Sequence, residues 1–99
     1  MKSDIAQEKH VELREVIEQY EKACETEDQV DLRLYLPDSR HPDFELILRE
    51  LICTEMDHRW RKGCPRSLDE YQQEHPELFA DLAHLKEILF EDYRQRQQA

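Results

Sequence analysis

The chain is poor in glycine, in basic residues and in long apolar runs, and each shortage excludes a class of protein. A single glycine among 99 residues cannot build a glycine-rich phosphate-binding loop. Only 14 lysines and arginines accompany 24 aspartates and glutamates, and the net charge of −10 opposes broad contact with nucleic acid or anionic lipid. No stretch approaches the roughly 18 apolar residues of a membrane span, and the first ten residues lack the apolar core of a signal peptide. We therefore expect a cytoplasmic location and protein partners, without nucleic acid or membrane contact.

Motifs for catalysis and for metal binding are also missing. The three cysteines are an odd number at wide spacing, which fits reduced thiols better than a disulfide framework. No C-x-x-C or H-x-x-x-H pair occurs, and the spacing of Cys53, His58 and Cys64 suits no common zinc module. Neither G-x-S-x-G nor H-E-x-x-H is present. We expect no enzyme activity, no metal and no cofactor in this chain.

The sequence is rich in residues that favour helix. Glutamate, leucine, glutamine and arginine are frequent, and few β-branched residues occur together. A chain of this length forms one domain with a modest core. The composition predicts an all-α bundle of about five helices, three long and two short. We expect a single helical domain over residues 1–93, followed by a polar tail or the start of a linker at 94–99.

Capping residues and prolines predict the bounds of these helices. The long helices are expected at 4–25, at 42–62 and from Pro76 onward, and the short ones at 32–36 and 67–74. Proline opens two of the long helices and Gly63 ends the central one. The apolar stripe expected on the last helix consists of Leu78, Leu82, Leu85 and Leu89, widened by Phe79, Ile88 and Phe90.

The central helix carries an ion pair on its apolar side. At about 100° per residue, Glu55 and Arg59 fall about 20° and 60° from Phe44, inside the stripe that Leu48 and Leu51 form. Residues four apart can pair along a helix, and the acid stands in the favourable N-terminal position. An adjacent arginine lowers the pKa of a carboxyl, which suits a structural role better than general acid–base catalysis. We expect Glu55 and Arg59 to form a partly buried structural pair, completed by the hydroxyl of Tyr35 or Tyr71.

The only basic concentration lies at the end of the same helix. Trp60 points about 160° away from Phe44, and an exposed tryptophan among basic residues is typical of interface anchors. The alternative is that the basic residues serve the helix C-terminus while Trp60 covers the core. The candidate interaction surface consists of Trp60, Arg61, Lys62 and Arg66.

Several short motifs occur in a characteristic order between Val16 and Phe90. L-x-x-Y-L-P begins at Leu32, and L-x-R-E-L-I-x-x-E-x-x-x-R runs from Leu46 to Arg59. G-x-P-x-S-L-x-E-Y follows over 63–71, and H-P-E over 75–77. This series resembles the N-terminal helical region of planctomycete-type serine/threonine protein kinases, a region that precedes the catalytic domain. The kinase signatures V-A-I-K, H-R-D and D-F-G are absent, so these residues cannot transfer a phosphoryl group.

The resemblance implies an accessory domain. We expect a non-catalytic regulatory or docking domain at the N-terminus of a bacterial serine/threonine kinase, whose catalytic domain lies outside this sequence. Its partner is another protein or the kinase domain of the same chain, and the oligomeric state stays open. The alternative is a stand-alone helical adaptor that binds another signalling protein. A DNA-binding module that uses the basic helix end is disfavoured by the net charge.

Overall fold

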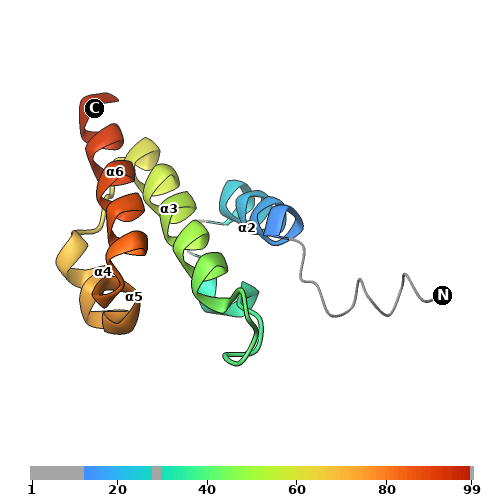
Figure 1. The fold of residues 1–99 in the computed structure, drawn as a ribbon. Coiled ribbons are helices and arrows are strands. Elements are labelled where there is room, and N and C mark those ends of the chain that lie inside the picture. The colour runs from blue at the N-terminus through green and yellow to red at the C-terminus, as the bar shows by residue number, and fades with distance from the viewer. Residues whose placement is uncertain (1–12, 28–29, 99) are drawn as a thin grey trace.

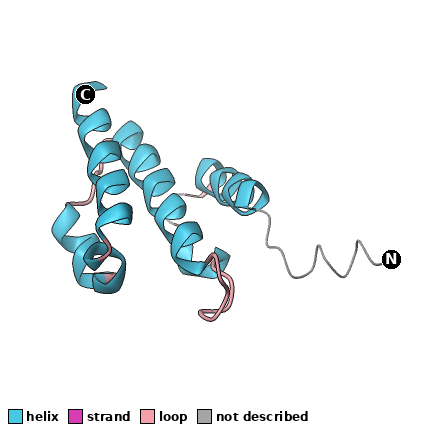
Figure 2. Ribbon diagram, viewed as in Figure 1, coloured by secondary structure: helices cyan, strands magenta, loops and turns pink. Residues whose placement is uncertain are grey.

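The computed structural model describes residues 13–27 and 30–98, and within these ranges every regular element is a helix (Figures 1 and 2). The long helices are α2 (Leu13–Thr26), α3 (Phe44–Lys62) and α6 (Leu82–Gln98). The short elements are the 3-10 turn η1 (Leu32–Tyr35) and the helices α4 (Leu68–Glu74) and α5 (Pro76–Ala80). This arrangement confirms the predicted all-α bundle. The predicted helix start at Asp4 lies outside the described residues.

Helix α3 is the centre of the bundle. It lies between α2 on one side and α6 on the other (Figure 1), so it is covered from two directions. Its apolar residues Ile47, Leu51 and Ile52 are fully buried, as the predicted stripe requires. Burying apolar side chains against both neighbours removes their apolar area from water and stabilises the fold. Leu48 and Met56 of α3 are also buried, and the rest of the core comes from the flanking elements: Tyr20, Cys24, Leu32, Tyr71, Leu78, Phe79 and Ile88.

Local interactions explain where α3 begins and ends, and its first residue differs from the prediction. We expected the helix to open at Pro42, but it begins at Phe44. The N–H of Asp43 donates to Nδ1 of His41 at 3.0 Å, which holds these residues in a turn before the helix. At the other end Gly63 has φ 78°, a conformation that glycine adopts without steric cost. The predicted glycine cap is therefore confirmed.

The caps of the short elements also agree with the sequence. The side chain of Asp31 accepts from the N–H of Arg33 at 3.0 Å and caps η1. The Ser67 hydroxyl accepts from the N–H of Glu70 at 3.3 Å and caps α4. These two local hydrogen bonds fix where η1 and α4 begin.

The last helix was predicted wrongly as one continuous element. Pro76 does open a helix, but α5 ends at Ala80 and the backbone of Asp81 is extended. The Asp81 carboxylate accepts from the N–H of Ala83 at 3.0 Å and starts a new helix. The break changes the direction of α6, so the stripe expected from Leu78 onward does not form. Leu78 is buried, whereas Leu82 and Leu89 are exposed.

Helix α6 continues to Gln98, through residues 94–98 that we expected to form a polar tail. The amide of Gln95 is buried and donates to Asp57 on α3 at 3.0 Å and to Glu91 at 2.6 Å. Arg96 donates to the buried carboxylate of Asp92 at 2.8 Å. The bond to Asp57 attaches the last turns of α6 to α3, and the other two join successive turns of α6 itself, which explains why a polar sequence remains helical there.

Candidate functional site

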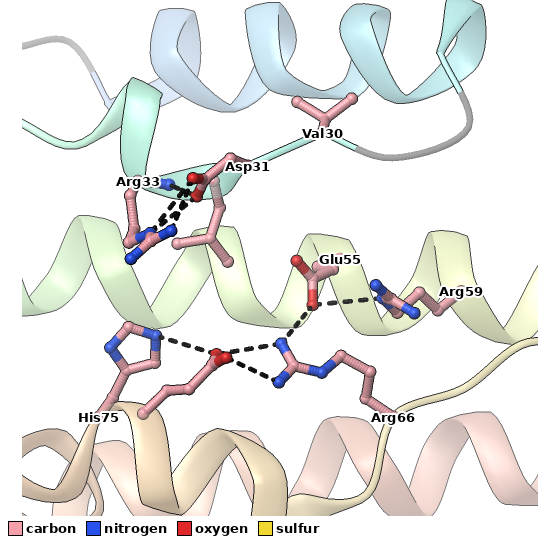
Figure 3. A pocket seen from close by; sticks show the side chains of 9 residues that line it. Val30, Asp31, Arg33, Glu55, Arg59, Arg66 and His75 are labelled. Carbon is pink, nitrogen blue, oxygen red and sulfur yellow. Dashed lines mark hydrogen bonds and ion pairs between the residues drawn. The ribbon is translucent and has the colours of Figure 1, made fainter.

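Glu55 is a carboxylate buried at the centre of the bundle. It is only 8 % exposed, and side chains from four segments converge on it. The hydroxyl of Tyr71 donates to Oε1 at 2.6 Å, and the hydroxyl of Tyr20 donates to Oε2 at 3.3 Å. The guanidinium groups of Arg59 and Arg66 lie 3.5 and 3.6 Å from Oε1 (Figure 3). A buried carboxylate is stable when hydrogen bonds and opposite charge replace its water, and Glu55 has both.

The structure therefore brings together the predicted pair Glu55 and Arg59, and adds partners that the sequence did not indicate. Of the two tyrosines proposed to complete the site, Tyr71 does so. Tyr35 instead packs edge-on against the ring of Tyr20, with 5.5 Å between ring centroids. Tyr20 and Arg66 are 35 and 11 residues away from Glu55 in sequence, so helical spacing could not reveal them.

The two tyrosines act as permanent hydrogen-bond donors. Burial, reinforced by the negative charge of Glu55, raises the pKa of Tyr71 and of Tyr20 above the ordinary value of 10.0. Both hydroxyls therefore keep their protons at physiological pH. The oxygens of Glu55 are thus in contact with two hydroxyl donors and two guanidinium groups.

Arg66 belongs to this buried site. Its guanidinium lies 2.9 Å from both Glu70 and Glu74 and stands over the ring of Tyr71, 4.8 Å from the centroid. The hydrogen bond to Arg66 lowers the pKa of Glu74, and the same contact raises the pKa of Arg66. Arg66 is thus an internal connector between α3 and α4.

The other three residues of the predicted surface also have partners within the chain. Trp60 is partly buried, and the guanidinium of Arg96 lies over its ring at 5.8 Å. Arg61 forms an ion pair with Asp57 one turn earlier. Lys62 donates to the carbonyl of Cys24 at 2.9 Å and so binds the C-terminal end of α2. Each of the four predicted residues thus contacts a different neighbour within the chain.

A cleft of about 700 Å³ lies beside Glu55, between η1 and the start of α5 (Figure 3). Its charged groups are arranged in pairs. Arg33 donates to both carboxylate oxygens of Asp31, from Nε to Oδ1 at 3.0 Å and from Nη2 to Oδ2 at 2.9 Å. These hydrogen bonds lower the pKa of the Asp31 carboxyl. Burial lowers the pKa of His75, so the ring is neutral near pH 7. The paired charges leave no strong site for an ionic ligand among the described lining residues.

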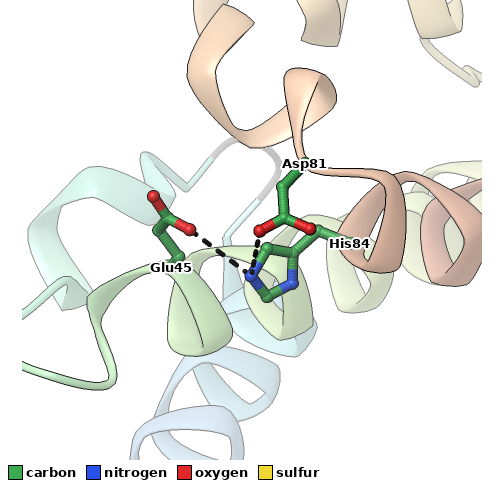
Figure 4. A group of neighbouring side chains, drawn as sticks. All are labelled: Glu45, Asp81 and His84. Carbon is green, nitrogen blue, oxygen red and sulfur yellow. Dashed lines mark ion pairs between the residues drawn. The ribbon is translucent and has the colours of Figure 1, made fainter.

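Glu45, Asp81 and His84 form the one metal-compatible cluster of the described residues (Figure 4). Nε2 of His84 lies 3.5 Å from Glu45 and 4.0 Å from Asp81. Nδ1 lies 3.3 Å from the guanidinium of Arg49, which can only donate. In a neutral ring Nδ1 must then be the acceptor and Nε2 must carry the proton. Nε2 then directs its proton toward the two carboxylates, so the cluster links the starts of α3 and α6 electrostatically.

Sequence analysis missed the outward face of α6, defined here as Leu82, Leu89, Phe90 and Tyr93. These side chains are 65, 45, 62 and 61 % exposed, and they account for four of the five large hydrophobic side chains exposed in the described residues. The remaining one is Leu34 on η1. The signal was present in the sequence, because Phe90 and Tyr93 cannot face the same way as Ile88 on one helix. The prediction that Phe90 widens the buried stripe is therefore wrong.

Comparison of the chain with protein-family models, with curated proteins and with solved structures found no match.

Proposed function

We propose that the chain is a non-catalytic docking domain that regulates a bacterial serine/threonine protein kinase from its N-terminal side. The single observation that carries docking is the outward face of α6. Clustered exposed apolar side chains on a folded protein mark interaction sites more often than scattered ones do. The series of motifs from Leu32 to Glu77 supports the kinase setting, and the chain supplies none of the phosphoryl-transfer signatures itself.

The composition of the outward face of α6 fits a protein partner. Aromatic residues are enriched at protein interfaces, and Phe90 and Tyr93 stand one turn apart on the exposed side. The net charge of −10 disfavours a nucleic acid partner. A cytoplasmic setting belongs to the same proposal and agrees with the three free cysteines.

The kinase setting is tested by the reading frame that follows the codon for Ala99. A frame that continues into a glycine-rich loop, V-A-I-K, H-R-D and D-F-G supports the proposal. A stop codon directly after Ala99 contradicts it. In that case the stand-alone adaptor, acting through the same face of α6, takes its place.

The docking role is tested by Phe90→Asp in the complete protein. We expect this substitution to change the rate at which the kinase phosphorylates itself or its substrate, because a charge at the centre of an apolar interface opposes binding. Leu34→Asp is the matched control, since Leu34 is even more exposed, at 79 %, but lies on η1. An unchanged rate in the Phe90 variant contradicts a regulatory role for this face.

A further inference from the structure

We propose that the outward face of α6 binds α6 of a second copy of the chain in an antiparallel arrangement. This inference rests on the proposed docking function and names the partner as the protein itself. The domain would then bring two kinase chains together. The positions of charged residues around the apolar face favour this partner and this orientation.

The apolar face runs along the helix, and Lys86 lies within it between Leu82 and Leu89. At about 100° per residue, Leu82, Leu89, Phe90 and Tyr93 fall within an arc of about 100°. From first to last they span about 16 Å, or three turns. Figure 1 shows α6 at the edge of the bundle, alongside α3 and on the opposite side from α2. A helix of a second copy can therefore lie against this strip without meeting α2.

Two opposite charges stand on the same edge of the strip. Glu87 and Arg94 lie about 140° and 120° around the helix from Leu82, next to the apolar arc. Glu87 is exposed and has no ion pair within the described residues. Arg94 is about half exposed and contacts Glu91 at 3.2 Å with one nitrogen, which leaves further donors available.

An antiparallel pair with its two-fold axis beside Phe90 uses both charges. This two-fold axis keeps like edges together and reverses the helix direction, so Glu87 of each copy comes level with Arg94 of the other. Two ion pairs then flank the apolar contact. Lys86, which lies within the arc, comes within about two residues of Tyr93 of the other copy, where a cation can contact the ring. In a parallel pair Glu87 would instead face the edge of Leu85 and Arg96, and neither ion pair would form.

Sedimentation velocity on the 99-residue chain tests the pairing. We expect a mass that rises with concentration from 12.1 kDa toward twice that value. Phe90→Asp is expected to keep the chain at 12.1 kDa over the same range, whereas Leu34→Asp is expected to leave the association unchanged. A chain that is monomeric at every concentration overturns the proposal. So does a dimer that Phe90→Asp does not weaken, because its interface would lie elsewhere.

A charge exchange tests the antiparallel orientation. Glu87→Arg alone and Arg94→Glu alone should each weaken the dimer by about tenfold or more, since each places like charges face to face. The double variant should restore association to near the parent level. If the double variant is no better than the single ones, the residues do not face each other and the antiparallel geometry is wrong.

The same variants separate this inference from the docking function. A chain that stays monomeric, while Phe90→Asp still alters kinase activity, overturns self-association and leaves docking to another protein in place. If the chain dimerises through α6 but Phe90→Asp leaves the kinase activity unchanged, the result supports self-association and contradicts the regulatory function.

Discussion

Glu55 on α3 and Phe90 on α6 are opposites of each other. The first is a charged side chain inside the protein, and the second is a large apolar side chain outside it. Glu55 receives two hydroxyl donors and two guanidinium groups, all from the same chain. Phe90 and its neighbours have their broad apolar surface in water. A buried charge without partners would destabilise the fold, so a buried charge with a complete set of partners indicates a structural role.

The difference separates what holds this fold together from what the protein can bind. The site around Glu55 is closed, because its donors and charges are satisfied within the chain. The outward face of α6 is incomplete, because only another molecule can remove it from water. We therefore expect substitutions around Glu55 to change the free energy of unfolding, and substitutions on α6 to change association.

The largest effect is expected from Glu55→Ala. Removing the carboxylate leaves two buried tyrosine hydroxyls without an acceptor and leaves Arg59 and Arg66 without their shared anion. We expect a loss of about 3–5 kcal/mol in the free energy of unfolding, measured by urea denaturation. Glu25→Ala, an exposed site on α2, is the matched control and should change little. A variant as stable as the control would show that water reaches Glu55 and satisfies these groups.

The next largest effect comes from the shorter of the two tyrosine bonds. Tyr71→Phe removes a 2.6 Å hydrogen bond to a charged group, and we expect a cost of about 1.5–3 kcal/mol. Tyr20→Phe removes a 3.3 Å bond to the same carboxylate and should cost less. Thermal unfolding of the two variants side by side checks this order. Equal losses would mean that the two hydroxyls bind Glu55 equally well.

Features that depend on near neighbours in sequence could be predicted. Helical spacing placed Glu55 and Arg59 on the buried side, and both meet there. Gly63 and Ser67 end and start helices by bonds to residues within four positions. The same logic gave the helical class, because each helix carries its own start and stop signals.

Features that depend on distant residues could not be predicted. Lys62 donates to the carbonyl of Cys24, 38 residues away in sequence. Nothing in local spacing indicates that the end of α2 lies beside Lys62. The break at Asp81 is a competition between continuing a helix and capping a new one. Tertiary contacts decide such competitions, and His84 provides one directly after the break by its contact with Glu45 on α3. Missing this break reversed the expected exposure of Leu82 and Leu89.

A smaller effect is expected from pH through His75. Burial lowers its pKa below the ordinary 6.5, against the opposing influence of Glu74, so the unfolded chain binds a proton more readily than the folded one. As the pH falls through about 6.5, the unfolded state binds a proton and is stabilised relative to the folded state. The free energy of unfolding therefore decreases. Glu74, whose pKa Arg66 lowers, adds a further loss only below its ordinary value of 4.5.

Urea denaturation at pH values above and below 6.5, for the parent and for His75→Asn, isolates this contribution. The parent should lose more stability across that interval than the variant does. Equal losses would assign the pH dependence to other groups. The decrease should be smaller than the cost of Tyr71→Phe, since His75 is at the edge of the cleft and not at the centre of the site.

The smallest effect on folding is expected from Phe90→Ala. Phe90 and the fully buried Ile88 are two residues apart on the same helix, so they differ in exposure and not in backbone context. Ile88→Ala should cost about 2–5 kcal/mol, whereas Phe90→Ala should stay within about 0.5 kcal/mol in dilute solution. At high protein concentration the stability loss caused by Phe90→Ala should come closer to the loss caused by Ile88→Ala. If the parent dimerises through α6, binding adds to its apparent stability, and Phe90→Ala removes that addition. A loss for Phe90→Ala that is the same at every concentration would mean that the ring supports the fold itself.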